Sequence, residues 1–158
     1  MKRLLAVVVL AVATTAAQFA SAQGNVADVT DMQALRDVVR TDKKAFVASK
    51  LALTPAEAKK FWPLYDQYQR ALTVVGQQRA VSLEGQLSRP VPMSNPYAKQ
   101  LAAASIAADD AEIRARHRLY NRLMRVLPAI KAARYLQLEA KFRAVRDYDL
   151  ASTIPLIH

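Results

Sequence analysis

The chain has 158 residues, of which 53% are hydrophobic, and it carries a formal net charge of +10 and no cysteine. The lack of cysteine excludes a disulfide-stabilised scaffold and a thiolate metal site. Because there are only three glycines and almost no alternation of β-branched residues after residue 22, the composition predicts an almost wholly helical domain.

Residues 1–22 are predicted to be a signal peptide. Two basic residues precede an apolar run over residues 4–17, which is too short to span a bilayer, and an Ala-Ser-Ala signal-peptidase site ends at Ala22. Cleavage after Ala22 predicts export to the periplasm. Residues 23–158 are then expected to form a single soluble domain of net charge +8, a balance that favours acidic or anionic partners.

A first helix is predicted over residues 30–50, with Thr30 as its capping residue. One face of this helix collects large apolar side chains but is interrupted by the charge of Asp42. The apolar residues are Met32, Leu35, Val39 and Phe46. Because the face is partly polar, we expect this helix to dock only loosely.

The strongest helix-start signal in the chain lies at residues 53–57. Thr54 can cap a helix, Pro55 occupies the first helical position, and Glu57 can reach back in a capping box. This second helix is predicted to run to about Leu87. Its packing stripe recurs in steps of four and three residues and consists of Phe61, Tyr65, Tyr68, Leu72 and Val75.

Three residues predict irregularity in this second helix. Pro63 removes one backbone hydrogen bond and should bend the helix. Gly76 and Gly85 should each weaken it by about 1 kcal/mol relative to alanine. Trp62 lies beside the packing stripe, where it is either a core residue or an exposed or dimer-facing aromatic contact.

A proline-rich turn over residues 89–96 separates the two halves of the chain. A third helix, rich in alanine at first, is predicted to be capped by Asn95, to start at Pro96 and to run to Arg125, and a fourth follows the boundary at Pro128. The packing stripe of the fourth helix consists of Tyr135, Leu138, Phe142 and Val145. The apolar segment over residues 152–158 is expected to tuck against the bundle.

Four arginines of the third helix form the candidate partner-binding surface. They follow one another in steps of four, four and three residues, which places them on one helical face; they are Arg114, Arg118, Arg122 and Arg125. Like charges at this spacing repel one another mildly. Two interpretations stay open: a solvated helix face, or a surface for acidic clients, anionic lipid or a sensor domain, with Trp62 as an aromatic contact.

Enzymatic and metal-binding functions find little support in the sequence. The chain has no glycine-rich phosphate loop and no nucleophile motif, and its only histidines are His117 and His158. A transition-metal site needs several converging nitrogen or sulfur ligands. The carboxylates Asp109, Asp110 and Glu112 are interpreted as solubilising groups on the alanine-rich helix. We therefore expect no enzymatic activity, no metal and no cofactor, and export argues against a nucleic-acid partner.

Residues 53–57, Leu-Thr-Pro-Ala-Glu, resemble the Leu-Thr-x-x-Gln motif of the Spy/CpxP family of small periplasmic helical proteins. Leu53, Thr54 and Glu57 occupy the motif positions, with glutamate in place of glutamine. At the place of a second copy stand residues 127–131, Leu-Pro-Ala-Ile-Lys, which lack both threonine and glutamine. The signal peptide, the size, the basic charge and the absence of cysteine fit the same family.

The resemblance implies an all-α fold of four long, bent helices in two helical hairpins, which pairs as an antiparallel, cradle-like homodimer. It further implies an ATP-independent chaperone that binds unfolded or envelope proteins in an envelope stress response. The alternative is a regulatory module that binds one envelope partner, such as a sensor kinase domain, without general chaperone activity. A third possibility, contact with an anionic membrane surface, uses the same arginines, and the sequence does not choose among the three.

Overall fold

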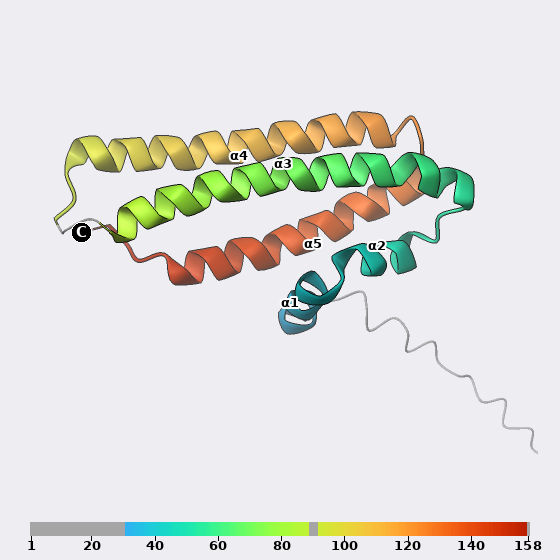
Figure 1. Ribbon diagram of the computed structural model, residues 1–158, viewed down its shortest axis with the longest axis horizontal. Helices are drawn as coiled ribbons and strands as arrows, with labels where there is room; N and C mark the ends of the chain where they lie inside the picture. The colour runs from blue at the N-terminus through green and yellow to red at the C-terminus, as the bar shows by residue number, and fades with distance from the viewer. Residues whose placement is uncertain (1–30, 89–91, 158) are drawn as a thin grey trace, which may run out of the picture. The chain divides into compact units, whose positions relative to one another are not determined.

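The structure, a computed structural model, describes residues 31–88 and 92–157, which contain five α-helices and no strand (Figure 1). The helices are α1 (Met32–Thr41), α2 (Lys43–Leu51), α3 (Pro55–Leu87), α4 (Asn95–Leu123) and α5 (Ala129–Thr153). The all-α class predicted from the composition is confirmed for this part of the chain. The predicted signal peptide at residues 1–22 lies outside the described residues.

The long helices α3, α4 and α5 form the body of the fold. α3 and α4 make the most extensive contact, as an antiparallel hairpin, whereas the backbones of α1 and α2 pack on α5 (Figure 1). This arrangement differs from the predicted four helices in two hairpins. The predicted first helix is divided into two, and neither part forms a hairpin with α3.

The division between α1 and α2 occurs at Asp42, which ends one helix and caps the next. Its backbone leaves the helical region (φ −152°, ψ 81°), and its carboxylate accepts a hydrogen bond from the N–H of Ala45 at 2.8 Å. Aspartate favours such a cap because its short side chain competes for backbone N–H groups. The same chemistry occurs at Asp31, whose carboxylate accepts a hydrogen bond from the N–H of Gln33 at 2.8 Å. The cap of α1 is therefore Asp31, and the prediction of Thr30 as the cap is wrong.

The predicted start of α3 is confirmed in detail. The Thr54 hydroxyl accepts a hydrogen bond from the N–H of Glu57 at 3.3 Å, and the Glu57 carboxylate accepts from the N–H of Thr54 at 2.8 Å, which completes the capping box. The helix continues through Pro63 to Leu87. Just before it, Ala52 adopts a left-handed backbone (φ 44°, ψ 55°) that ends α2.

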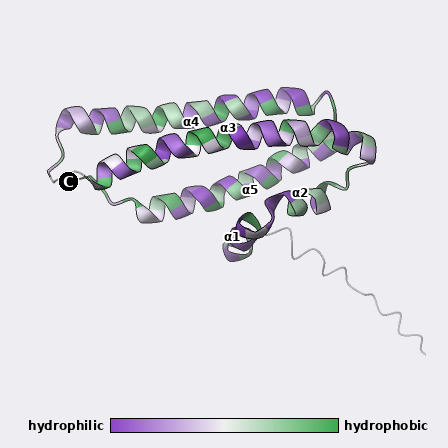
Figure 2. Ribbon diagram, in the orientation of Figure 1, coloured by the Kyte–Doolittle hydropathy of each residue, from purple (hydrophilic) through white to green (hydrophobic). Residues whose placement is uncertain are grey.

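The core lies between the three long helices and is completed by α2. The ring of Phe61 on α3 packs edge-on against Tyr135 on α5, with 5.0 Å between ring centroids. Of the stripe predicted on α3, only Leu72 is partly exposed. The stripe predicted on α5 is buried at all four positions. Hydrophobic and hydrophilic residues alternate along each long helix (Figure 2), and none of the described helices has the length and apolar character needed to cross a membrane.

The two glycines of α3 should respond differently to alanine. A Cβ atom at Gly76 would meet nothing within 4 Å, whereas one at Gly85 would lie 2.7 Å from the hydroxyl oxygen of Tyr97. We therefore expect Gly76→Ala to raise the free energy of unfolding by about 1 kcal/mol through helix propensity. Gly85→Ala should bring no gain, because the Tyr97 side chain must move. Urea unfolding followed by circular dichroism measures both, and equal stabilisation by the two substitutions would contradict this account.

Candidate functional site

All four predicted arginines are exposed to solvent. Arg114, Arg118 and Arg122 lie on α4, as predicted, whereas Arg125 lies in the turn that follows, because the helix has already ended. The N–H of Arg125 donates to the carbonyl oxygen of Arg122 at 3.1 Å, so Arg125 stays next to the other arginines. We call these four residues the arginine stripe. The guanidinium of Arg122 donates to the side-chain oxygen of Gln67 on α3. Arg122 of the arginine stripe therefore contacts the neighbouring helix α3.

A groove of about 310 Å³ lies between α3 and α4, and two of the four arginines, Arg118 and Arg122, line it. Much of its remaining lining is apolar and includes Leu64, Tyr68, Ala71, Ala115 and Leu119. The two arginines are exposed, whereas Leu64, Tyr68 and Leu119 are buried, so the charges lie above an apolar floor. We call this site the arginine groove. It can hold an apolar side chain while a guanidinium pairs with a carboxylate beside it.

Trp62 does not join the arginine groove. It is half-buried, and its ring packs edge-on against Phe61 and Tyr65, at centroid distances of 4.9 Å and 5.4 Å. The ammonium group of Lys44 on α2 lies 5.1 Å from the centroid of the Trp62 ring. The groove residue Leu64 is two positions further along α3, which is about 200° around the helix. Trp62, the predicted aromatic contact, therefore lies on a different side of α3 from the groove residue Leu64.

Residues 53–57 and residues 127–131, the two segments compared above with the family motif, meet in space. Their fifth residues, Glu57 and Lys131, form an ion pair of 2.7 Å between the starts of α3 and α5, and Lys131 also donates to the carbonyl oxygen of Ala52 at 2.8 Å. The hydrogen bond from Lys131, followed by the one from the N–H of Thr54, lowers the pKa of the Glu57 carboxyl. Leu53, at the first motif position, is partly buried. α5 itself begins without a side-chain cap, so Lys131 joins two helix starts instead of capping one.

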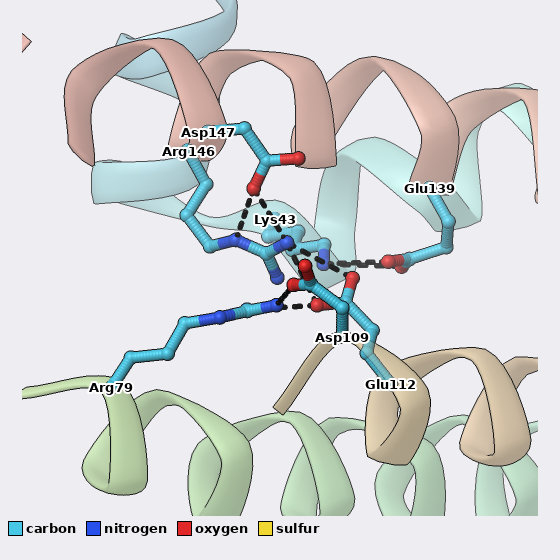
Figure 3. Close-up of polar contacts among 7 residues, drawn as sticks. All are labelled: Lys43, Arg79, Asp109, Glu112, Glu139, Arg146 and Asp147. Carbon is cyan, nitrogen blue, oxygen red and sulfur yellow. Dashed lines mark hydrogen bonds and ion pairs between the residues drawn. The ribbon is translucent and has the colours of Figure 1, made fainter. Parts of the chain in front are cut away.

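A buried carboxylate connects α3, α4 and α5 (Figure 3). Glu112 on α4 is 5% exposed and accepts hydrogen bonds at 2.9 Å from Arg79 of α3 and from Arg146 of α5. Asp109 pairs with Arg79 at 2.6 Å, and Asp147 with Arg146 at 2.8 Å. The interpretation of Glu112 as a solubilising group is therefore wrong, because this carboxylate lies in the core and holds three helices together.

Two opposing effects act on the pKa of Glu112. Burial by itself would raise this pKa, but the hydrogen bonds and charges of Arg146 and Arg79 outweigh burial and lower it. The carboxylate is therefore ionised in the folded protein at neutral pH, and its charge is balanced by two guanidinium groups from neighbouring helices.

A second buried carboxylate, Glu139 on α5, gathers partners from α2 and α3. The Tyr135 hydroxyl donates to it at 3.0 Å, the Gln69 side-chain amide at 3.1 Å, and the Lys43 ammonium at 3.1 Å. Burial, followed by the charge of Glu139, raises the pKa of Tyr135, so its hydroxyl stays protonated and can donate. The Lys43 ammonium also lies 4.6 Å from the ring centroid of Phe142. Within the described ranges, no buried side-chain nitrogen or oxygen lacks a hydrogen-bond partner.

Sequence reasoning missed these two buried carboxylates, although the sequence contains a signal for both. Glu112 falls in step with the buried Ala108 and Ala115, and Glu139 falls in step with the buried Tyr135. A single acidic residue on an otherwise apolar helical stripe predicts a buried carboxylate with cationic partners. Both clusters hold the helices together, and none of their residues lines the arginine groove.

No metal centre is formed by the described residues. His117 is exposed on α4, and no group of three histidine, aspartate or glutamate side chains in these ranges lies close enough to hold a metal ion. Comparison of the chain with protein-family models, with curated proteins and with solved structures finds no match.

Proposed function

We propose that the protein is exported to the periplasm after cleavage of residues 1–22 and acts there as an ATP-independent, chaperone-like protein of the Spy/CpxP type. It binds unfolded or envelope proteins and needs no cofactor. The observation that supports this proposal is the arginine groove, in which Arg118 and Arg122 stand over an apolar floor on an exposed face. An unfolded polypeptide offers the matching groups in succession, namely apolar side chains and carboxylates.

The arginine stripe and the arginine groove have different roles in the proposed binding. The four exposed arginines attract acidic segments over about 10 Å, the screening length of moderate salt, and thereby raise the rate of encounter. The apolar floor then holds one of the neighbouring side chains. Because the groove is small, at about 310 Å³, each contact is weak and a bound segment is released readily. Two copies of the chain in a homodimer would add a second groove and increase avidity.

The test is suppression of aggregation. The mature chain, residues 23–158, is added without nucleotide to an unrelated, chemically unfolded protein, and light scattering is followed at low and at moderate salt. We expect protection that fades with salt. Replacing Arg114, Arg118, Arg122 and Arg125 with glutamine should raise the concentration needed for protection about tenfold, since each exposed charge contributes a few tenths of a kcal/mol.

A matched control removes four other exposed charges. The residues are Lys59, Lys60, Arg70 and Lys99, none of which lines the arginine groove. Their replacement with glutamine lowers the net charge equally and should leave protection unchanged. An equal loss of protection in both variants would show that binding depends only on total charge. Full protection by the arginine variant would contradict the electrostatic mechanism.

The alternative function is a regulatory module that binds one folded envelope partner, such as a sensor kinase domain. The same exposed arginines support it, because a folded acidic surface also fits them. A well-folded chain that gives no protection against aggregation would favour this alternative. Salt-sensitive binding to vesicles that contain anionic lipid, absent with neutral vesicles, would instead favour contact with a membrane surface.

A further inference from the structure

A polar cavity of about 300 Å³ lies between α3 and α5, and α1, α2 and α4 each add one residue to its walls. It shares only Tyr68 with the arginine groove. Both buried carboxylates, Glu112 and Glu139, line this cavity, together with their cationic partners Arg146 and Lys43 (Figure 3). Because both carboxylates already accept hydrogen bonds from protein groups, neither needs a donor from a ligand.

Tyr68 brings an unused hydrogen-bond donor to the polar cavity. The residue is 6% exposed, yet its hydroxyl makes no hydrogen bond with any residue that the structure describes. Every side-chain oxygen in these ranges that is sealed from solvent has a partner, so this hydroxyl must reach open space. Burial, followed by the charge of Glu139, raises the pKa of Tyr68, so the hydroxyl stays protonated. The charged residues that act on this pKa line the polar cavity, whereas Arg118 and Arg122 of the arginine groove are not among them, so the hydroxyl opens on the polar cavity.

Arg143 on α5 brings an unused cation to the same cavity. Its side chain is half-buried, and it forms no ion pair or hydrogen bond with another residue of the described ranges. Its positive charge opposes the effect of burial on the pKa of Tyr68, which places the guanidinium near the hydroxyl. Two donors without protein partners therefore lie close together at one cavity.

The charges in the walls leave one positive charge unbalanced. Three cationic side chains line the cavity, those of Lys43, Arg143 and Arg146, and they face the two carboxylates of Glu112 and Glu139. The carboxylates are paired with Lys43 and Arg146, so the remaining charge is that of Arg143. A ligand carboxylate matches it, because its two oxygens can accept from a guanidinium and from a phenolic hydroxyl at the same time.

We infer that the polar cavity is a binding site for a small monocarboxylate with a short apolar group, whose carboxylate is bound by Arg143 and Tyr68. The apolar group contacts the hydrophobic side chains of the lining, Val39, Leu72 and Phe142. The volume, about 300 Å³, is at the lower end for ligand sites, so the ligand is a small acid. A dianion such as phosphate fits less well, because its second charge would face two buried carboxylates. The inference goes beyond the proposed function, since it concerns a small molecule and, apart from Tyr68, other residues.

The test is a titration of the protein with benzoate, followed by NMR spectra of the backbone amides. We expect binding in the millimolar range, with the signals around Tyr68 and Arg143 shifting. Benzamide has the same shape without the charge and should bind at least about tenfold more weakly, because it loses the charge-assisted hydrogen bonds. Inorganic phosphate should also bind more weakly than benzoate. No binding of benzoate, equal binding of benzamide or tighter binding of phosphate would overturn the inference.

Two substitutions remove the donors one at a time. Arg143→Gln should weaken benzoate binding about tenfold and Tyr68→Phe about fivefold. Neither leaves a protein group without its partner, so both variants should fold, which circular dichroism checks. Unchanged binding of benzoate by the folded Arg143→Gln variant would contradict the assignment of the site.

Arg116→Gln is the matched control. Arg116 is half-buried and has no ion-pair partner among the described residues, as is true of Arg143, and it lines a neighbouring opening but not the polar cavity. This variant should bind benzoate like the wild-type chain, and an equal loss would place the anion in the neighbouring opening and overturn the inference. The variant with glutamine at the four positions of the arginine stripe should also retain benzoate binding, so failure of the chaperone proposal and failure of this site are distinguishable.

Discussion

Replacing Glu112 with alanine should lower the free energy of unfolding by about 3 kcal/mol. The substitution leaves Arg79 and Arg146 without the carboxylate that both contact at 2.9 Å. Removal of one partner from a buried ion pair costs about 3–5 kcal/mol. The lower end applies because the Arg146 side chain is 36% exposed and can turn toward water. Urea unfolding at neutral pH, followed by circular dichroism, measures the loss.

Asp109→Ala is the control for the Glu112 variant. Asp109 pairs with the same guanidinium, that of Arg79, at 2.6 Å, but its side chain is 61% exposed. An exposed pair of this kind contributes at most about 1 kcal/mol. A loss as large as that of the Glu112 variant would show that burial does not determine the cost, and would contradict the argument.

The pH dependence of the same comparison gives a second measurement. The folded-state pKa of Glu112 is lowered from its ordinary value of 4.5. A carboxyl whose pKa is lower in the folded state contributes stability above its unfolded pKa, and the contribution is lost as the pH falls through the folded pKa. The stability difference between wild type and Glu112→Ala should therefore be largest near neutral pH and shrink as the pH falls below about 4.5.

Replacing Phe61 with alanine should cost about 4 kcal/mol of unfolding free energy. The ring is fully buried and packs against Tyr135 at 5.0 Å, against Trp62 at 4.9 Å and against Tyr65 at 6.0 Å, measured between centroids. The substitution removes the edge-on contact of the Phe61 ring with Tyr135 of α5 and leaves a cavity that the aromatic neighbours cannot fill, for which losses of about 3–5 kcal/mol are typical. Thermal or chemical unfolding measures the change.

Trp62→Ala tests whether burial decides this result. Trp62 is the neighbour of Phe61 in sequence and is the larger side chain, but it is half-buried and contacts Lys44 at the surface. Its removal should cost less than half as much as removal of Phe61, because the lost apolar area is smaller. If the two variants lose equal stability, Trp62 belongs to the core and the assignment of Phe61 as the central aromatic residue is wrong.

The features that could be predicted from the sequence are the local ones. Helix class, the start of α3 and the exposure of the arginines depend on residues within one or two turns of one another, as in the capping box of Thr54 and Glu57. The break at Asp42 is also local. Apolar residues at helical spacing on both sides of Asp42 favour one continuous helix, but the capping preference of aspartate prevails.

The features that could not be predicted depend on residues far apart in the chain. Glu112 meets Arg79 and Arg146 across 33 and 34 residues, and Lys131 meets Glu57 across 74. Periodicity indicates which face of a helix is buried, but not which neighbouring helix covers it. The arginine groove is non-local for the same reason, because Arg122 acquires an apolar floor only through the packing of α4 on α3.

The buried carboxylates have a consequence for how the helices align. The apolar side chains of α5 recur every three or four residues, so sliding α5 by one turn, about 5.4 Å, would bring similar side chains back into contact. The charges do not repeat in this way. A one-turn slip would take Arg146 away from Glu112 and would take Glu139 away from Lys43, leaving buried charge unpaired. The polar pairs therefore select a single register for α5, and that register also determines where the chain after Thr153 leaves the bundle.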